Sequence, residues 1–143
     1  MNVASIPKQE FARRRKALMA LMDENSIAIV PAAPERTRSR DTEHHYRQDS
    51  DFFYLSDFAE PESVLVLIPG REHGEYVLFC RDKDLSREIW DGYRAGPAGA
   101  CTDFLADDAF PIDDIDEILP GLIEGRERVY YAMGKDSSFD SQV

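Results

Sequence analysis

The sequence predicts a single α/β domain with a mixed β-sheet and helices on both of its faces. Short apolar segments typical of strands alternate with segments that have helical spacing. One of the apolar segments, Glu62–Ile68, is apolar on both faces, as expected of a central strand that is covered on each side. The length of 143 residues suits one domain, and no internal repeat or linker divides the chain.

A long helix is predicted first, from about residue 5 to residue 22. The apolar residues expected on its inner face are Phe11, Leu18, Leu21 and Met22. The basic run Arg13–Lys16 lies inside this helix and, at about 100° per residue, is spread around its axis. We therefore expect a solvated surface in which Glu10 pairs with Arg14, and no nucleic-acid site.

The remaining elements follow in order. Strands are expected at Ser26–Val30, Phe52–Leu55, Glu62–Ile68, Glu75–Cys80, Phe110 and Arg128–Ala132. A short helix opened by Asp84 or Ser86 and ended by Gly92 should carry Leu85, Ile89 and Trp90 on its apolar side. The small residues of Ala95–Ala100 indicate a loop, Thr102–Leu105 a helical turn. A further helix begins at Pro111, with Ile115, Ile118, Leu119 and Leu122 as its inner stripe.

Charge and composition exclude several classes of partner. The net charge of −11 repels nucleic acid and anionic membranes. The longest apolar runs, Val64–Ile68 and Tyr76–Cys80, are far shorter than the ~20 residues of a membrane span. The N-terminus lacks the apolar core of a signal peptide, so we expect a cytoplasmic protein whose Cys80 and Cys101 are reduced thiols.

Motifs that would carry catalysis are missing from the sequence. It has no GxSxG, P-loop, GxGxxG or HExxH motif. The polar loop Glu35–His45 offers possible metal ligands in Asp41, Glu43, His44 and His45, but without a fixed spacing we expect hydrogen bonds within the loop and no metal site. For Trp90 two interpretations stay open: it packs its helix onto the sheet, or it forms an exposed platform for a ligand or partner.

Four separated groups of residues together resemble a known family. They are Arg38, Ser39 and Asp41; Tyr46, Arg47, Gln48, Ser50, Asp51, Phe52, Tyr54 and Leu55; Glu60, Pro61 and Glu62; and Glu88, Ile89 and Trp90. In this order they resemble the N-terminal domain of bacterial Xaa-Pro aminopeptidase (aminopeptidase P), of the creatinase/prolidase "pita-bread" group. The resemblance covers essentially residues 1–143. It implies the fold of that domain and a mainly structural role for Tyr46, Arg47, Ser50, Asp51, Phe52 and Tyr54.

The resemblance also implies where the chemistry lies. The family enzyme is a metallopeptidase that releases an N-terminal residue preceding proline, with two divalent metals, usually manganese, in a larger C-terminal domain. This chain stops before that domain, so we expect no catalytic residue, metal ligand or cofactor in it and no activity of the chain alone. The expected partners are its own C-terminal catalytic domain, further copies in a homo-oligomer, and peptides with proline second.

Two residues acquire a specific role from the resemblance. The positions that match Asp41 and Trp90 approach the substrate, largely across a subunit boundary, so the domain would support oligomers and shape access to the active site. The sequence departs from the family at His44, where an aromatic is common, and at Asp57, where Gly is common. Two alternatives remain: a free-standing binding or assembly module of the same fold, and the N-terminal domain of a prolidase or creatinase relative.

Overall fold

The computed structural model describes residues 6–33 and 48–131 and shows a mixed five-stranded sheet with the strand order β4-β3-β2-β1-β5. Its strands are β1 (Ser26–Pro31), β2 (Val64–Leu67), β3 (Tyr76–Cys80), β4 (Asp108–Pro111) and β5 (Arg128–Tyr131). Its helices are α1 (Lys8–Leu21), α2 (Ser50–Ser56), α3 (Leu85–Asp91), α4 (Gly96–Phe104), the 3₁₀ turn η1 (Ile112–Asp114) and α5 (Ile115–Ile123).

The central strands pair antiparallel and the outer strands pair parallel. Strand β2 lies between β1 and β3, with Val66 opposite Ile29 on one side and opposite Val77 on the other. Strand β5 runs parallel to β1, and β4 runs parallel to β3. This arrangement confirms the predicted mixed sheet and the central position of the segment that is apolar on both faces.

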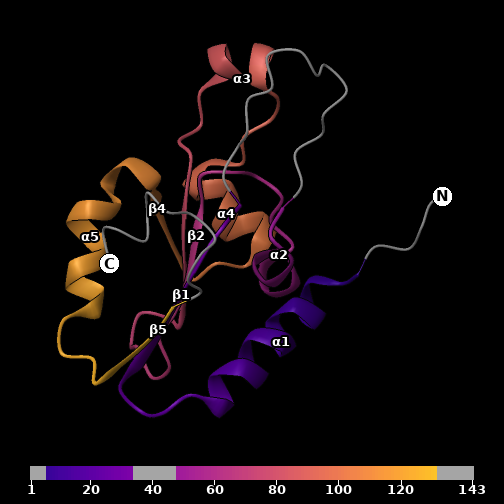
Figure 1. Cartoon of the computed structure of the whole chain (residues 1–143). Coiled ribbons are helices and arrows are strands. Elements are labelled where there is room, and N and C mark those ends of the chain that lie inside the picture. Colours follow the sequence, from indigo (N-terminus) through magenta and orange to yellow (C-terminus); the bar gives the residue numbers. More distant parts are fainter. Residues whose placement is uncertain (1–5, 34–47, 132–143) are drawn as a thin grey trace.

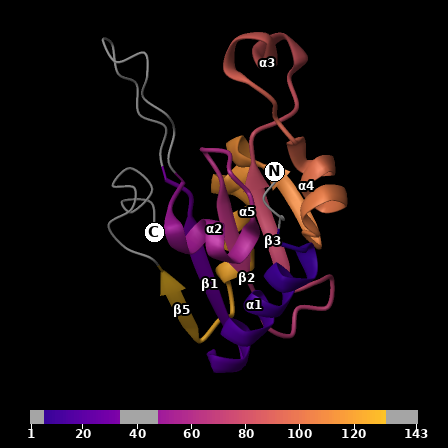
Figure 2. The same cartoon turned by 90° about the vertical axis from the view of Figure 1, so that its right-hand side faces the viewer.

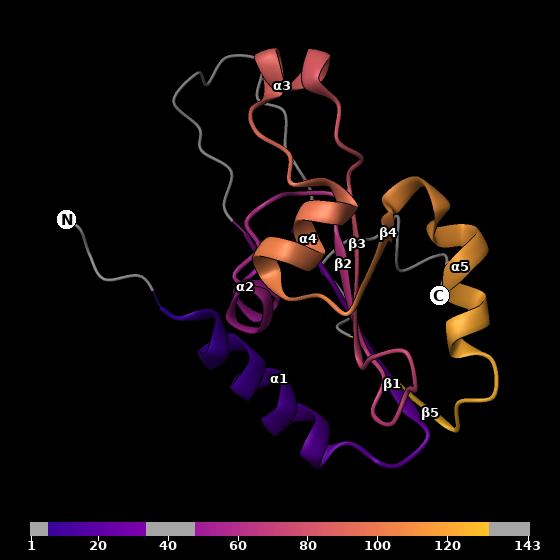
Figure 3. The ribbon, with the colours of Figure 1, turned by 180° about the vertical axis from the view of Figure 1, so that it is seen from behind.

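The sheet separates two apolar layers, and helices cover both faces (Figures 1 and 3). On one face lie α1, α2 and α4, where the buried side chains include Phe52, Phe58, Leu65 and Leu78. On the other face lies α5, where Ile115 and Leu119 pack against Ile27, Val66 and Phe79. Each fully buried side chain of this kind stabilises the fold by about 1.5–3 kcal/mol, so both layers hold the sheet in place.

Helix α1 agrees with the prediction in extent but not in which side chains it buries. Phe11 is buried, and Arg14 pairs with Glu10 at 3.0 Å as expected. Leu21, predicted to face inward, is 83% exposed. Arg15, predicted to be solvated, is only 4% exposed. A long side chain can bury its apolar stem if its charged end finds partners, and Arg15 donates a 2.7 Å hydrogen bond to the carbonyl oxygen of Leu55.

The segment Phe52–Leu55 is helical, so the predicted strand is wrong. Its aromatic residues favour a strand intrinsically, but both ends carry helix caps. The carboxylate of Asp49 accepts from the backbone N–H of Phe52 at 2.9 Å, and Asp57 ends the helix in the left-handed conformation, at φ 63°. Phe52 and Leu55, three positions apart, then share the buried face.

Of the segment Ala95–Ala100, all but Ala95 belongs to helix α4, so the predicted loop is wrong. Pro97 lies in the first turn of α4, where its missing N–H costs nothing. The small residues permit close packing: Gly96 and Ala100 are buried, and α4 lies against β3 and β4. Low helix propensity in Gly96 and Gly99 is therefore outweighed by tertiary contacts.

Helix α3 projects away from the sheet and the other helices (Figures 1 and 2). It begins after Asp84 and ends at Gly92, as predicted, but its apolar residues Leu85, Ile89 and Trp90 are exposed to solvent. None of the described helices is both long and apolar enough to cross a membrane.

Candidate functional site

The candidate site is the arm, which we define as residues 82–95, the segment that joins β3 to α4 and carries α3 (Figure 1). Four of its large apolar side chains are exposed: Leu85, Ile89, Trp90 and Tyr93. Trp90 is 85% exposed, so the interpretation in which it packs onto the sheet is wrong. Clustered apolar side chains in solvent are typical of interaction surfaces, which favours the interpretation of Trp90 as an exposed platform.

Local hydrogen bonds explain why so short a helix forms in the arm. The carboxylate of Asp84 accepts from the backbone N–H groups of Ser86, at 3.2 Å, and Arg87, at 3.3 Å, and from the Ser86 hydroxyl at 2.8 Å. These bonds favour the charged carboxylate and lower the pKa of Asp84. Gly92 ends the helix at φ 97°, a conformation that side-chain-bearing residues rarely adopt.

Lys83 connects the two ends of the arm. Its ammonium donates to the carbonyl oxygen of Arg94 at 2.7 Å and to Oε1 of Glu88 at 3.1 Å. The same ammonium lies 4.1 Å from the ring centroid of Tyr93, in a cation–π contact. One side chain that precedes α3 therefore contacts a residue within the helix and two residues that follow it.

Glu88 is the one partly buried side chain among residues 85–90 of α3. Its side chain is 11% exposed, and Oε1 also accepts from the backbone N–H of Arg94 at 3.1 Å. Burial alone raises the pKa of Glu88, but the Arg94 N–H and the Lys83 ammonium outweigh this effect and lower the pKa below its ordinary value. We call Lys83, Glu88 and the Arg94 backbone the brace.

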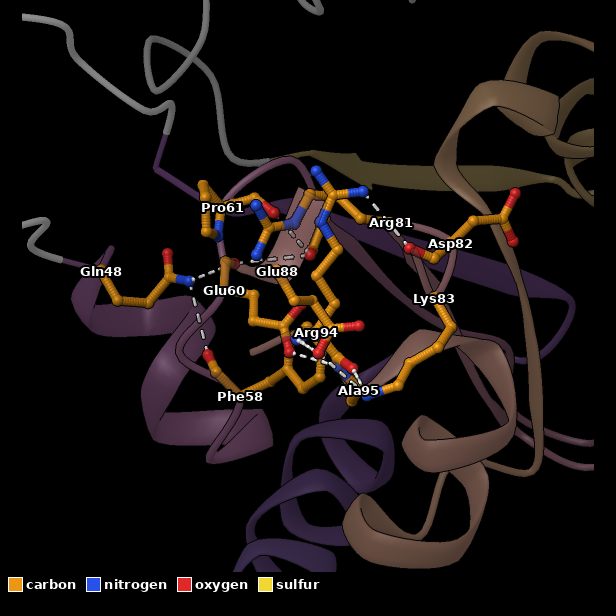
Figure 4. A network of polar contacts seen from close by, with 11 residues as sticks. Gln48, Phe58, Glu60, Pro61, Arg81, Asp82, Lys83, Glu88, Arg94 and Ala95 are labelled. Atoms are coloured by element: carbon orange, nitrogen blue, oxygen red, sulfur yellow. Dashed lines mark hydrogen bonds and ion pairs between the residues drawn. The ribbon is translucent and has the colours of Figure 1, made fainter. Parts of the chain in front are cut away.

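Glu60 fixes the base of the arm (Figure 4). Its Oε2 accepts from the backbone N–H of Ala95 at 2.8 Å, and its Oε1 accepts from Arg81 at 3.3 Å. Gln48 donates to the carbonyl oxygen of Glu60 at 2.9 Å and accepts from the backbone N–H of Ala33 at 2.9 Å. Segments distant in the sequence, at the ends of β1, β3 and the arm, are thereby joined in one network.

The structure describes only some of the residues that the resemblance named. Asp41, Tyr46 and Arg47 lie outside the described residues, as does the loop with His44 and His45. Ser50 and Asp51 form the first turn of α2, and Phe52 is buried beneath it. Tyr54 is exposed, with the Arg14 guanidinium 4.2 Å from its ring centroid. Trp90 belongs to α3, the helix of the arm.

Sequence reasoning gave Gln48, Glu60 and Glu88 no individual role, although all three belong to the resemblance. Their common property is a polar side chain that is mostly buried and bonded to a backbone atom outside its own element, between 6 and 35 positions away. Lys83 was missed altogether. Within residues 6–33 and 48–131, no three His, Cys, Asp or Glu side chains are grouped so that they could hold a metal ion, so no metal ligand is assigned there.

The fold and the arm define an α/β domain with a projecting helix whose apolar side chains are exposed, and comparison with known proteins gives its family. The family model described as "Aminopeptidase P, N-terminal domain" matches residues 11–130. The chain belongs to this family. The resemblance found in the sequence is thereby confirmed, together with the fold that it implied.

Relatives of known sequence and structure agree with this assignment. The Xaa-Pro aminopeptidase of Escherichia coli K12 is 46% identical over 134 residues, which are 93% of this chain and 30% of that protein. The solved aminopeptidase PepP of Pseudomonas aeruginosa superimposes with a TM-score of 0.92 at 67% identity, over 98% of this chain and 32% of that one. A zinc-substituted E. coli aminopeptidase P with product superimposes with a TM-score of 0.89 at 44% identity, over 97% of this chain and 32% of that one.

The match is confined to one part of these proteins. The chain spans about a third of the length of the relatives and solved structures that it matches. It corresponds to their N-terminal part, as the description of the family model states.

Proposed function

We propose that this chain acts as the N-terminal domain of an Xaa-Pro aminopeptidase, a metallopeptidase that releases the N-terminal residue preceding proline. The observation that carries the proposal is the family match combined with the arm, which exposes Trp90 to solvent and is held by the brace. Four large apolar side chains exposed together are unfavourable in an isolated domain, whereas in a domain that contacts a neighbour they are buried at the interface. The domain supports oligomers and shapes access to the active site.

The reaction itself belongs to a C-terminal catalytic domain. Two divalent metal ions, manganese in this proposal, would be held there and would activate the attacking water. The zinc-substituted relative supports metal chemistry for the family. This chain contributes no metal ligand and is inactive alone, so manganese and an Xaa-Pro peptide added to the 143-residue chain give no turnover. Its place of action is the cytoplasm.

Trp90 is the residue through which this domain reaches the substrate. Its indole combines a large apolar surface with an N–H donor, a combination common in contact surfaces. We place it against the active site of a neighbouring subunit, where it walls the peptide pocket, with Leu85, Ile89 and Tyr93 beside it at the subunit boundary. Asp41 acts at the same site by binding the free amine of the peptide or a nearby arginine.

The test uses the longer protein in which a catalytic domain follows this chain. Trp90→Ala is expected to lower kcat/KM for an Xaa-Pro peptide by about tenfold, which corresponds to about 1.4 kcal/mol of transition-state stabilisation. Tyr54→Ala serves as the matched control, because it truncates an exposed aromatic residue that lies on α2 and outside the arm, and it leaves the kinetics unchanged. Unchanged kinetics in Trp90→Ala would refute the role of Trp90.

The substrates that the longer protein hydrolyses distinguish an Xaa-Pro aminopeptidase from a prolidase or a creatinase. Turnover of longer peptides with proline second supports an Xaa-Pro aminopeptidase, whereas turnover of Xaa-Pro dipeptides alone or of creatine indicates a prolidase or creatinase. Light scattering of the wild type and of Trp90→Ala reports whether the exposed face of the arm contributes to the oligomer.

A further inference from the structure

We propose that Lys83 and Glu88 are positioning residues that hold Trp90 in the orientation in which it meets the substrate. The inference rests on the role proposed above for Trp90 and adds the contacts that fix the orientation of Trp90. Neither side chain needs to touch the substrate, because both act through the direction in which α3 points.

The arm lacks the apolar packing that normally fixes a helix. Among residues 85–90 of α3, every side chain other than Glu88 is exposed. Most helical stability in proteins comes from burial of an apolar face, and α3 directs its apolar residues to solvent. Within its own chain, the orientation of α3 therefore depends on polar contacts, and the brace supplies them.

Helix geometry links the brace to Trp90. Glu88 and Trp90 are two positions apart, and at about 100° per residue their side chains leave the helix about 200° apart. Glu88 points into the arm, where Lys83 and the Arg94 N–H hold its carboxylate. Trp90 consequently points outward on the opposite side, so fixing Glu88 fixes the direction of the indole.

Close approach of the two ends of the arm makes the brace possible. A Cβ atom at Gly96 would lie 3.0 Å from the Cβ of Lys83 and 3.3 Å from its backbone nitrogen. Gly96 has φ +73°, which also favours glycine. The chain that leaves the arm thus runs directly against the chain that enters it, and the Lys83 ammonium reaches the Arg94 carbonyl oxygen across this contact.

The small free energy expected of the ion pair between Lys83 and Glu88 indicates that the brace orients the arm more than it stabilises the fold. The Lys83 side chain is 43% exposed, and an exposed ion pair contributes only about 0–1 kcal/mol to stability. Several such contacts on one short segment can nevertheless select a single orientation of it. Removal of the Lys83 ammonium should therefore leave the domain folded while the arm loses its fixed direction.

The first measurement uses the single tryptophan of this chain as a reporter. In Lys83→Met, which keeps most of the apolar stem and removes the ammonium, the fluorescence anisotropy of Trp90 falls because α3 moves more freely. Lys16→Met makes the same chemical change on an exposed position of α1 and leaves the anisotropy unchanged. Lys83→Arg, which restores a cation, recovers part of the signal. Equal anisotropy in Lys83→Met and the wild type would overturn the proposal.

The second measurement is a double-mutant cycle in the longer protein with its catalytic domain. Lys83→Met is expected to lower kcat/KM for an Xaa-Pro peptide about fivefold, and to have no further effect when Trp90 is already alanine. A fivefold loss that persists in the Trp90→Ala background shows that Lys83 acts independently of Trp90 and overturns the proposal. If Trp90→Ala is itself silent, the role proposed for Trp90 fails, and the anisotropy alone decides whether the brace holds the indole.

Discussion

The guanidinium of Arg15 lies 4.0 Å from the centroid of the Tyr76 ring, joining α1 to β3 in the buried interior. Arg15 also donates to the carbonyl oxygen of Leu55, at the end of α2. Burial lowers the pKa of Arg15 and raises the pKa of Tyr76. A single buried cation therefore ties two helices to the sheet.

Replacement of Arg15 is expected to be costly. Arg15→Met should lower the free energy of unfolding by about 2–3 kcal/mol, because it leaves the Leu55 carbonyl unpaired and removes a charge-assisted hydrogen bond. Tyr76→Phe keeps the ring and removes a hydroxyl that has no hydrogen-bond partner among the described residues, so it should change stability by less than about 0.5 kcal/mol. Urea unfolding of both variants measures the contrast. A cost in Arg15→Met as small as in Lys16→Met would contradict this account.

The Asp49 cap makes the helical state of the Ser50–Ser56 segment testable. Asp49→Ala is expected to lower the free energy of unfolding by about 1 kcal/mol, since the N–H of Phe52 loses its acceptor. Asp49→Ser keeps an oxygen that can cap the helix and should restore most of the loss. Thermal unfolding of the two variants measures the difference. Equal losses in both would show that the carboxylate acts by some route other than capping.

The β2–β3 hairpin contains two glycines with positive φ that should respond differently to alanine. At Gly74 a Cβ would lie 2.2 Å from the Cβ of Asp107, whose carboxylate accepts from the Tyr76 N–H at 3.0 Å. Gly74→Ala should therefore cost about 2–4 kcal/mol, from the clash and the backbone strain together. A Cβ at Gly70 would meet no atom within 4 Å apart from its chain neighbours, so Gly70→Ala should cost only the strain, about 1 kcal/mol. Urea unfolding compares the pair, and equal costs would contradict the role of the Asp107 contact.

Alkaline pH should destabilise the domain through Cys80. Burial, with the nearby carboxylates of Glu60 and Asp82, raises the pKa of this thiol to about 12 from an ordinary value of 9.0. Between these values the unfolded chain has lost the proton that the folded chain retains, so stability falls as pH rises, by about 1.4 kcal/mol per pH unit. Above pH 10 the raised pKa of Tyr76 adds to the fall.

Chemical unfolding at pH 8, 9, 10 and 11 measures this dependence. Cys80→Ala should be less stable than the wild type at pH 8, because a buried group is removed, yet lose less stability per unit between pH 9 and 10. Parallel curves for the two proteins would exclude Cys80 as the titrating group.

The centre of the sheet was predictable because β1, β2 and β3 are apolar on both faces. Ala28 and Leu65 face one side of the sheet and Ile29 and Val66 the other, and the structure buries all four. The stripe of α5 was predictable for the same reason, since Ile115 and Leu119 repeat at helical spacing and pack as expected.

Helix α2 and the first half of α4 were not predicted, because their local sequence favours another state, whereas the helical turn predicted at Thr102–Leu105 is the end of α4. The run from Phe52 to Leu55 has strand propensity and becomes helical through the caps at Asp49 and Asp57. Helix α4 begins at a Gly-Pro pair, and its packing against β3 is not visible in the sequence. The brace was missed for a related reason: Lys83, Glu88 and Arg94 look like ordinary surface charges until the ends of the arm are brought together.

The parallel pairing of β1 with β5 aligns Ser26 with Arg128, so the first strand of the sheet acquires its outer neighbour from the last. The β2–β3 hairpin can form as soon as residue 80 has left the ribosome, because its contacts are local. The β1–β5 ladder has to wait until residue 131 has emerged. During that interval β1 has an unpaired edge, to which a chaperone can bind and with which a strand of a neighbouring nascent chain can pair.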